Sequence, residues 1–504
     1  METTATPGSS RWSPAGALRG LIEADLTRPT HFAALAAAFL IARAPLLGYG
    51  AGTDPDAWRV VLTGQYLWET GKYFPSRLPG NPLHELVIAP FVPLGWVATN
   101  LVTALAALVG VYVFARIVSH LRLPHAGLLT IGFAFTPLLF INSIATMDYM
   151  WALTAILGAY YATLRRWPVW AGVLLGVAAG FRLQSLVVGL PLAYLMWRRG
   201  DFARVFPLGL AAAGTVTLAF APVLAVYGLD FFSYYDSPVA YQDVIRLLGK
   251  ESLGVIGSLS VLIGLAVSLP RLKRLPSDAI SDPQVGAWLL LIGVYFLSFF
   301  RLPHEIAYLA PVFPFGLMLM ARYLSRAVLT GVVASIILAG LVDITDIGDS
   351  YNMDALRSAR IGGGLLVSNV QTMKNQRAFV EDVLRAPVPN HSVVLSGFVY
   401  PQLALRERDR LQLRILQRDY GAISMLSDRG EAVDEGRDVR YVWLLTYDAF
   451  SALRSQGYSF FIVPDAVGGT AALYDFRPTL FGATFLHLER ASPSAGKGTA
   501  ATDR

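Results

Sequence analysis

The sequence contains no cysteine, which excludes disulfide bonds, thiolate metal sites and cysteine nucleophiles. Charge is also scarce, because Asp, Glu, Lys and Arg make up only 15% of the 504 residues, against about 25% in a typical soluble domain. We expect no cleavable signal peptide, since the first apolar run begins only near Phe32, after a polar segment rich in Ser, Pro and Ala. These absences argue against a soluble or disulfide-stabilised protein.

The chain is instead rich in apolar residues, which make up 54% of it. A polytopic α-helical membrane protein is the fold class that this composition predicts, with about eleven spans of roughly 17–22 residues. Pro90, Pro93 and Gly95 divide the apolar stretch 84–118 into an interfacial segment and a span from about Val97. The expected spans are 32–47, 97–118, 126–143, 147–164, 168–181, 183–197, 204–226, 253–269, 285–300, 304–321 and 325–342.

The net charge of +6 does not indicate nucleic-acid binding, because Lys and Arg gather in short clusters between the apolar runs. These clusters occupy every second loop, as the positive-inside rule requires of cytoplasmic loops. We therefore expect residues 1–30 to be a cytoplasmic N-terminal segment. The segments expected on the outer side are 50–83, 143–147, 182, 227–252, 301–304 and the chain after 345.

The composition becomes more polar after about Asp346, and no later run is long enough to span a bilayer. We expect residues 31–345 to form the transmembrane domain and residues 346–490 a small extracytoplasmic α/β domain. The last part, 491–504, is predicted to be a disordered tail. The expected strands are His391–Ser396, Tyr441–Thr446 and Ser459–Val463, with a helical pattern at Gln376–Leu384.

Two acidic residues, Asp54 and Asp56, flank a proline directly after the first expected span. One carboxylate could act as a general base on an acceptor hydroxyl, or the two could hold a divalent cation. Either could also cap the helix that begins near Ala57, and both roles are compatible. No other cofactor is predicted.

Two further charged residues interrupt apolar segments on the expected outer side. Asp148 lies at the turn between two spans, where a carboxylate is costly unless it is paired or hydrated, so it is a candidate for substrate binding. It could also cap the following helix. Arg182 breaks the positive-inside pattern and suits a lipid phosphate; snorkelling to lipid headgroups is the alternative.

The segment Arg301–Tyr308 places a cation, an imidazole, a carboxylate and a phenol within one outer turn. If a helix starts near Pro303, His304 and Tyr308 share a face. Arg301 and His304 could then meet a phosphate, while Glu305 and Tyr308 could contact a sugar; capping of a Pro-initiated helix is the alternative.

Other outer segments add weaker candidates. Tyr235 lies among aromatic residues beside Asp236, which could form a sugar platform or an interfacial aromatic belt. His84 and Glu85 close a turn shaped by Pro and Gly, and a binding role for them is secondary to that turn. Nearly every unexplained charge thus falls on one face. A transporter would place such groups near the bilayer midplane of two similar halves, and the sequence contains no persuasive internal repeat.

A first span, an outer loop that opens with an acidic motif, further spans and an outer C-terminal domain together resemble the GT-C superfamily of membrane glycosyltransferases. The likeness covers about residues 1–345 and is greatest to the branch of the protein O-mannosyltransferases and the aminoarabinose transferase of lipid A. It implies that Asp54, with Asp56 as alternate or partner, is the catalytic base. It also implies that Arg182 and the Arg301–Tyr308 turn face the donor phosphate, and that the protein resides in a bacterial inner membrane.

The resemblance implies transfer of a sugar, with inversion, from a polyprenyl-phosphate donor to an acceptor on the outer side. The expected partners are that donor, a lipid, glycan or protein acceptor, and membrane lipids. Two other hypotheses stay open at this point: a flippase for a lipid-linked sugar, and a non-catalytic membrane scaffold. Neither of these requires an outer carboxylate base.

Overall fold

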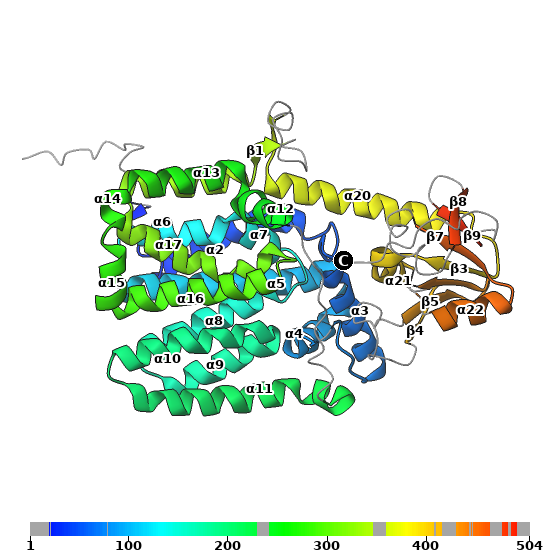
Figure 1. Ribbon diagram of the computed structural model, residues 1–504, viewed down its shortest axis with the longest axis horizontal. Helices are drawn as coiled ribbons and strands as arrows, with labels where there is room; N and C mark the ends of the chain where they lie inside the picture. The colour runs from blue at the N-terminus through cyan, green and yellow to red at the C-terminus, as the bar shows by residue number, and fades with distance from the viewer. Residues whose placement is uncertain are drawn as a thin grey trace, which may run out of the picture.

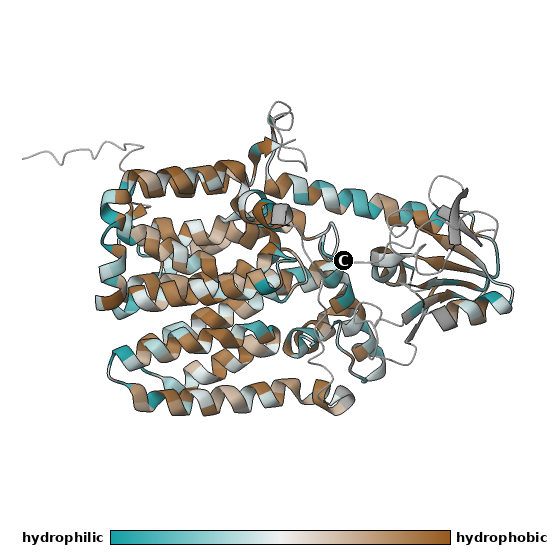
Figure 2. Cartoon of the chain, in the orientation of Figure 1, coloured by the Kyte–Doolittle hydropathy of each residue, from teal (hydrophilic) through white to brown (hydrophobic). Residues whose placement is uncertain are grey.

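The computed structural model describes residues 20, 22–77, 79–228, 241–345, 359–407, 410–415, 430–442, 445, 447–463, 476–481 and 485–490. A bundle of helices forms the larger part of the molecule, and a sheet lies at the opposite end (Figure 1). Apolar residues dominate the helices of the bundle (Figure 2). The predicted Tyr235 and the tail 491–504 fall outside the described residues.

The bundle is built from helices that the apolar runs predict, with proline at the start of many of them. The first group is α2 (Pro29–Arg43), η1 (Ala44–Leu46), α3 (Pro55–Thr70), α4 (Pro82–Ile88), η2 (Ala89–Leu94), α5 (Trp96–His120), α6 (Ala126–Phe135), α7 (Pro137–Ser143), α8 (Tyr149–Leu164), α9 (Pro168–Phe181), η3 (Leu183–Val188) and α10 (Gly189–Arg198). The second is η4 (Phe202–Arg204), α11 (Val205–Tyr227), α12 (Tyr241–Arg246), η6 (Leu247–Glu251), α13 (Ser252–Val267), α14 (Leu269–Leu272), α15 (Leu275–Ser281), α16 (Pro283–Arg301), η7 (Ile306–Leu309), α17 (Val312–Tyr323) and α18 (Arg326–Ala339).

Five of the described helices are long and apolar enough to cross a bilayer, and the bent pair α6–α7 could supply a sixth. Four more apolar helices in this part of the chain have 10–17 residues, which is short for a bilayer core of about 30 Å. The chain is therefore an integral membrane protein of the polytopic helical class. The predicted number of about eleven spans is not confirmed, and the orientation of the bundle stays a prediction.

Prolines account for two differences from the expected spans. The predicted span 126–143 bends by 56° between α6 and α7, because Pro137 cannot continue the hydrogen-bond ladder of α6. The predicted helix start near Pro303 is wrong. Leu302 is not helical, Glu305 is extended, a short 3₁₀ turn follows, and α17 begins only at Val312, after Pro311. His304 and Tyr308 therefore do not share one helical face.

The C-terminal part contains a seven-stranded mixed sheet of order β4-β5-β6-β3-β7-β9-β8, in which β3 and β7 correspond to the predicted strands His391–Ser396 and Ser459–Val463. The predicted strand Tyr441–Thr446 overlaps β6 only at its start, because β6 begins at Val439, and positions 443, 444 and 446 lie outside the described residues. The central strand β3 pairs in parallel with β6 and β7, with Val393 opposite Arg440 and Phe460, and every other pairing is antiparallel. Its strands are β3 (Ser392–Leu395), β4 (Gln412–Ile415), β5 (Gly430–Asp434), β6 (Val439–Val442), β7 (Ser459–Ile462), β8 (Phe476–Phe481) and β9 (Phe485–Arg490). The remaining elements are the hairpin of β1 (Val342–Thr345) and β2 (Arg360–Gly363), η8 (Gly397–Val399), and the helices α20 (Leu365–Arg385), α21 (Tyr400–Arg406) and α22 (Tyr447–Ser455).

The sheet is joined to the bundle by α20, which runs from the bundle to the sheet along one side of the molecule (Figure 1). It is longer than the predicted helix at Gln376–Leu384 because apolar residues extend the pattern back to Leu365. One apolar core includes Ala57 and Val61 of α3 together with Leu403 of α21 and Tyr441 of β6. The sheet region is thus packed against the loop and helix that follow the first span.

Candidate active site

Asp54 lies at the N-terminus of α3, directly after the first apolar helix. One of its carboxylate oxygens accepts a hydrogen bond from the backbone N–H of Asp56 at 2.9 Å, so the residue is the N-cap of α3. The other oxygen has no hydrogen-bond donor among the residues that the structure describes. Burial raises the pKa of Asp54 above its usual range, although Arg77 opposes this shift. Asp54 therefore combines a capping role with one available oxygen.

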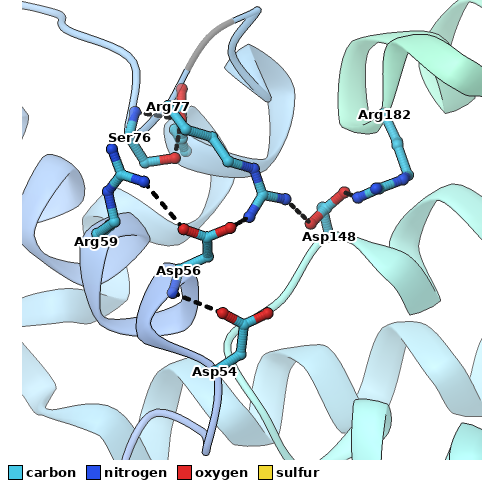
Figure 3. Close-up of polar contacts among 8 residues, drawn as sticks. Asp54, Asp56, Arg59, Ser76, Arg77, Asp148 and Arg182 are labelled. Atoms are coloured by element: carbon cyan, nitrogen blue, oxygen red, sulfur yellow. Dashed lines mark hydrogen bonds and ion pairs between the residues drawn. The ribbon is translucent and has the colours of Figure 1, made fainter. Parts of the chain in front are cut away.

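Asp56 has different surroundings. One carboxylate oxygen of Asp56 accepts a hydrogen bond from the guanidinium group of Arg59, one turn further along α3, at 3.1 Å. The other oxygen contacts the guanidinium group of Arg77 (Figure 3). Both oxygens are thus engaged by guanidinium groups. The pair Asp54 and Asp56 does not form a metal site with a third ligand, because no group of three or more His, Asp or Glu residues in the described ranges could hold an ion. The divalent-cation alternative therefore gains no support.

Arg77 belongs to a network of buried charged side chains, in which Asp148 lies between Arg77 and Arg182 (Figure 3). One oxygen of Asp148 accepts from Arg77 at 3.2 Å and the other from Arg182 at 2.8 Å. The side chain of Asp148 is fully buried. Burial raises the pKa of Asp148, but Arg182 and Arg77 outweigh it and lower the pKa below its usual range. The sequence predicts Asp148 as a substrate contact. In the structure its buried carboxylate pairs with two arginines and thereby orients them.

Arg182 ends α9 and is held from several sides. Its guanidinium carbon lies 4.5 Å from the ring centre of Tyr149 and 4.4 Å from that of Tyr308. Such cation–π contacts stabilise a guanidinium whose side chain is mostly withdrawn from water. The network thereby joins segments that are remote in sequence: the start of α3, the loop before α4, the start of α8, the end of α9 and the turn before α17.

The segment before α4 is fixed by Glu85, which is fully buried. Its carboxylate accepts from the hydroxyl of Tyr73 at 2.5 Å, and from the backbone N–H and hydroxyl of Ser76 at 2.7 and 2.6 Å. Glu85 therefore anchors the loop that carries Arg77. His84 is also fully buried, and neither ring nitrogen has a hydrogen-bond partner within the described part of the chain.

The turn between α16 and α17 reaches the network through Tyr308. Glu305, three residues earlier, is exposed. Desolvation by the neighbouring protein, with the charges of Asp54 and Glu251, raises the pKa of Glu305 to about 7. Arg301 is exposed at the end of α16, and Nε2 of His304 is buried without a hydrogen-bond partner.

Sequence reasoning missed several residues that complete the site. Arg59 could have been found from its spacing, since it follows Asp56 by three positions on a helix. Arg77 opens the polar outer segment 77–85, but nothing in the sequence indicates its pairing with Asp56 and Asp148. Tyr149 and α20 have no such signal. From α20, Asn369 donates to the hydroxyl of Thr53 at 3.1 Å and Gln376 to its carbonyl oxygen at 2.8 Å. The residue before Asp54 is thus held by a helix more than 300 positions away.

Comparison with known proteins finds likeness at the level of three-dimensional structure. No protein-family model matches the chain, and no curated protein sequence matches it either. The crystal structure of ArnT from Cupriavidus metallidurans in the apo state matches over 91% of this chain and 98% of its own, with a TM-score of 0.53 and 15% identity. The form bound to undecaprenyl phosphate matches over 93% and 100%, with a TM-score of 0.51 and 15% identity. The chain therefore shares its fold with ArnT.

Proposed function

We propose that the protein is an inverting glycosyltransferase that takes its sugar from a polyprenyl-phosphate donor. The observation that carries this proposal is the position of the available Asp54 oxygen beside the buried network of Arg77, Asp148 and Arg182. A base and a set of fixed cations next to each other are what a displacement at an anomeric carbon with an anionic leaving group requires. The ArnT structure with undecaprenyl phosphate has the same fold and supports a lipid phosphate as ligand.

Asp54 is the better base of the two acidic residues. Asp56 is neutralised by Arg59 and Arg77, so a proton on it would disrupt two ion pairs. Asp54 keeps one oxygen available, and its raised pKa makes it a stronger proton acceptor than an ordinary aspartate. Its capping bond to the start of α3 fixes the direction of the carboxylate.

The network contains three guanidinium groups (Arg59, Arg77 and Arg182) and three carboxylates (Asp54, Asp56 and Asp148). It is neutral while Asp54 is ionised and gains one positive charge when Asp54 takes the proton of the acceptor, at the moment when the phosphate leaves. Because these cations are already oriented by ion pairs, they stabilise charge on a departing phosphate without reorganising. The surrounding protein strengthens that attraction relative to water.

An apolar groove of about 740 Å³ offers a place for the lipid tail. It lies along α5, α8 and α9, and Trp151 and Phe181 line one end of it. Phe181 directly precedes Arg182, so this end adjoins the network. The stretch of α8 from Trp151 to Ala162 is twelve residues long and extends the groove over roughly 16 Å. A polyprenyl chain in this groove would bring its phosphate toward Arg182.

The reaction is a single displacement. The acceptor hydroxyl gives its proton to Asp54 and its oxygen forms a bond to the anomeric carbon. The bond between that carbon and the phosphate oxygen breaks, and its electron pair leaves with the polyprenyl phosphate. Attack from the face opposite the phosphate inverts the anomeric centre. Arg77 and Arg182 bind the phosphate, and Asp148 keeps both arginines in place.

The test uses the purified full chain with a panel of polyprenyl-phosphate sugars, each labelled in the sugar. We expect one or more donors to be consumed, with water as a slow acceptor, and the released sugar to have the inverted anomeric configuration by NMR. A retained configuration would contradict the single displacement. If no donor is cleaved but intact donor crosses the membrane of reconstituted vesicles, the protein is a flippase and the proposal is wrong.

A further inference from the structure

A second groove lies on another side of the bundle, away from the proposed donor groove. It has a volume of about 440 Å³, within the range of small-molecule pockets. Helices α2, α6, α7, α18 and α20 contribute to its walls. The lining residues are Ala42, Leu46, Phe135, Phe140, Ile337, Leu341, Leu366, Val367, Val370, Gln371 and Lys374.

The walls of this groove are apolar, but its rim on α20 is polar. Among the described residues that line it, Lys374 is the only charged one, and Gln371 lies one turn earlier on the same helix. The ammonium group of Lys374 is 5.3 Å from the ring centre of Tyr49, and both Lys374 and Gln371 are exposed. An apolar cleft with a single cation at its edge has the chemistry of a site for an amphiphile with an anionic head.

The surroundings of the groove match the surface of a membrane. Leu338, Leu341 and Val367 are 50%, 56% and 48% exposed, so an apolar patch borders the groove on the side of α18. Along α20 the residues change from apolar near Leu365 to hydrophilic further on (Figure 2). The groove thus lies where acyl chains would meet headgroups, with Lys374 on the headgroup side.

We infer that this groove binds one acyl chain of an anionic glycerophospholipid, whose phosphate pairs with Lys374. The inference goes beyond the proposed sugar transfer and does not depend on it. A zwitterionic lipid such as phosphatidylcholine would fill the apolar walls equally well, but the positive charge of its choline would offset part of the attraction between its phosphate and Lys374. A bound lipid would also brace α20 against α7 and α18, because its chain would contact all three helices.

The test is native mass spectrometry of the full-length protein with dioleoylphosphatidylglycerol and dioleoylphosphatidylcholine. We expect the first bound molecule of phosphatidylglycerol to have about fivefold higher affinity than the first bound molecule of phosphatidylcholine, because one lysine near an anionic headgroup contributes about that much. Lys374→Ala should abolish this preference. Val370→Trp should displace the lipid by filling the groove. The matched controls are Lys273→Ala, an exposed lysine, and Val267→Trp, a lipid-facing valine on α13, and both should bind as the wild type does.

Three results would overturn the inference. In the first, the wild-type protein binds both lipids equally. In the second, Lys374→Ala and Val370→Trp, each with the melting temperature of the wild type, retain the anionic lipid unchanged. In the third, undecaprenyl phosphate displaces the phosphatidylglycerol one for one, which would assign the groove to the donor. Each is a binding measurement, so a failure here is distinct from an absence of sugar transfer.

Discussion

At the scale of single residues, the site depends on two neighbouring carboxylates that have different hydrogen-bond and ion-pair partners. Asp54 and Asp56 are two positions apart in the same acidic motif, yet one caps a helix with an oxygen to spare and the other is enclosed by arginines. A proline between them directs the two side chains differently, since α3 begins at Pro55. The sequence shows both acids but not the guanidinium groups that distinguish them.

Asp148 offers a test of the buried network. Asp148→Asn would leave Arg182 without the carboxylate that it pairs with and Arg77 with Asp56 alone, and removal of one partner of a buried ion pair costs roughly 3–5 kcal/mol. We expect a clearly lower melting temperature. The control is Asp201→Asn, whose partners Arg166 and Arg204 are on the surface, where a change within about 0.5 kcal/mol is usual. Equal melting temperatures of the two variants would contradict the account.

Ionisation of Glu305 predicts how the KM for the donor changes with pH. With a pKa of about 7, its carboxyl group is neutral below that pH and ionised above it. Ionisation adds a negative charge near Arg77 and Arg182 and should weaken binding of an anionic donor. We expect the KM for the donor to rise as the pH increases from 6 to 8, about one unit to either side of that pKa. Glu305→Gln should flatten this rise, and a wild-type KM that is constant over this range would count against the assignment.

At the scale of elements, buried polar side chains stabilise breaks in the apolar helices. Where α6 gives way to α7, Arg43 donates to the carbonyl of Ala134 at 2.8 Å and to the hydroxyl of Ser143 at 2.6 Å. Phe39 and Phe140 lie against its guanidinium, with ring centres at 3.3 and 3.9 Å. Hydropathy therefore predicts the apolar segment 126–143 but not its bend, which occurs at Pro137 and is stabilised by Arg43 of the first span.

The start of the apolar part of α13 is capped from outside the helix. Asp343 of β1 accepts from the backbone N–H groups of Val255 and Ile256 at 2.8 and 2.9 Å. Gly254 has φ of 75°, and a side chain there would collide with the same carboxylate. Asp343→Ala should lower stability by about 0.5–2 kcal/mol, as loss of a helix cap does. Asp343→Asn keeps an acceptor oxygen and should lose less, and an equal loss in both variants would contradict a capping role.

The element boundaries that the sequence predicts well are those set by proline and by charge. The prediction places α9 at 168–181, as observed, because Pro168 begins it and Arg182 follows it. It fails at the 304–321 segment, where apolar residues continue through a turn that is not helical. Hydropathy measures the preference for lipid and not the backbone conformation, so a 3₁₀ turn inside an apolar run is invisible to it.

At the scale of the whole molecule, the C-terminal region contributes to the site through α20. The contacts of Asn369 and Gln376 with Thr53 fix the segment that leads into Asp54. The strands and the composition change were predictable from local patterns. The docking of α20 was not, because its partners are separated by more than 300 residues and no local pattern encodes the pairing.

This coupling predicts an effect on turnover from a distant helix. Gln376→Ala removes the hydrogen bond to the carbonyl of Thr53, and such a bond contributes about 1 kcal/mol, or about fivefold in rate if it serves to position Asp54. We expect kcat to fall by that factor while the melting temperature changes little. Asn375→Ala is the control, since its recorded hydrogen bond is to Gln371 on the same helix. Equal kcat values in the two variants would refute the coupling.

The central claim is that Asp54 is the base of a sugar transfer, and single-turnover cleavage of a labelled polyprenyl-phosphate sugar tests it most directly. Asp54→Asn should remain folded and slow cleavage by about 10²–10⁴-fold, the usual contribution of a general base. Asp56→Asn should slow cleavage much less, because Arg77 stays paired with Asp148 and so keeps its place near the site. If Asp56→Asn loses cleavage while folded Asp54→Asn retains it, the assignment of the base is wrong.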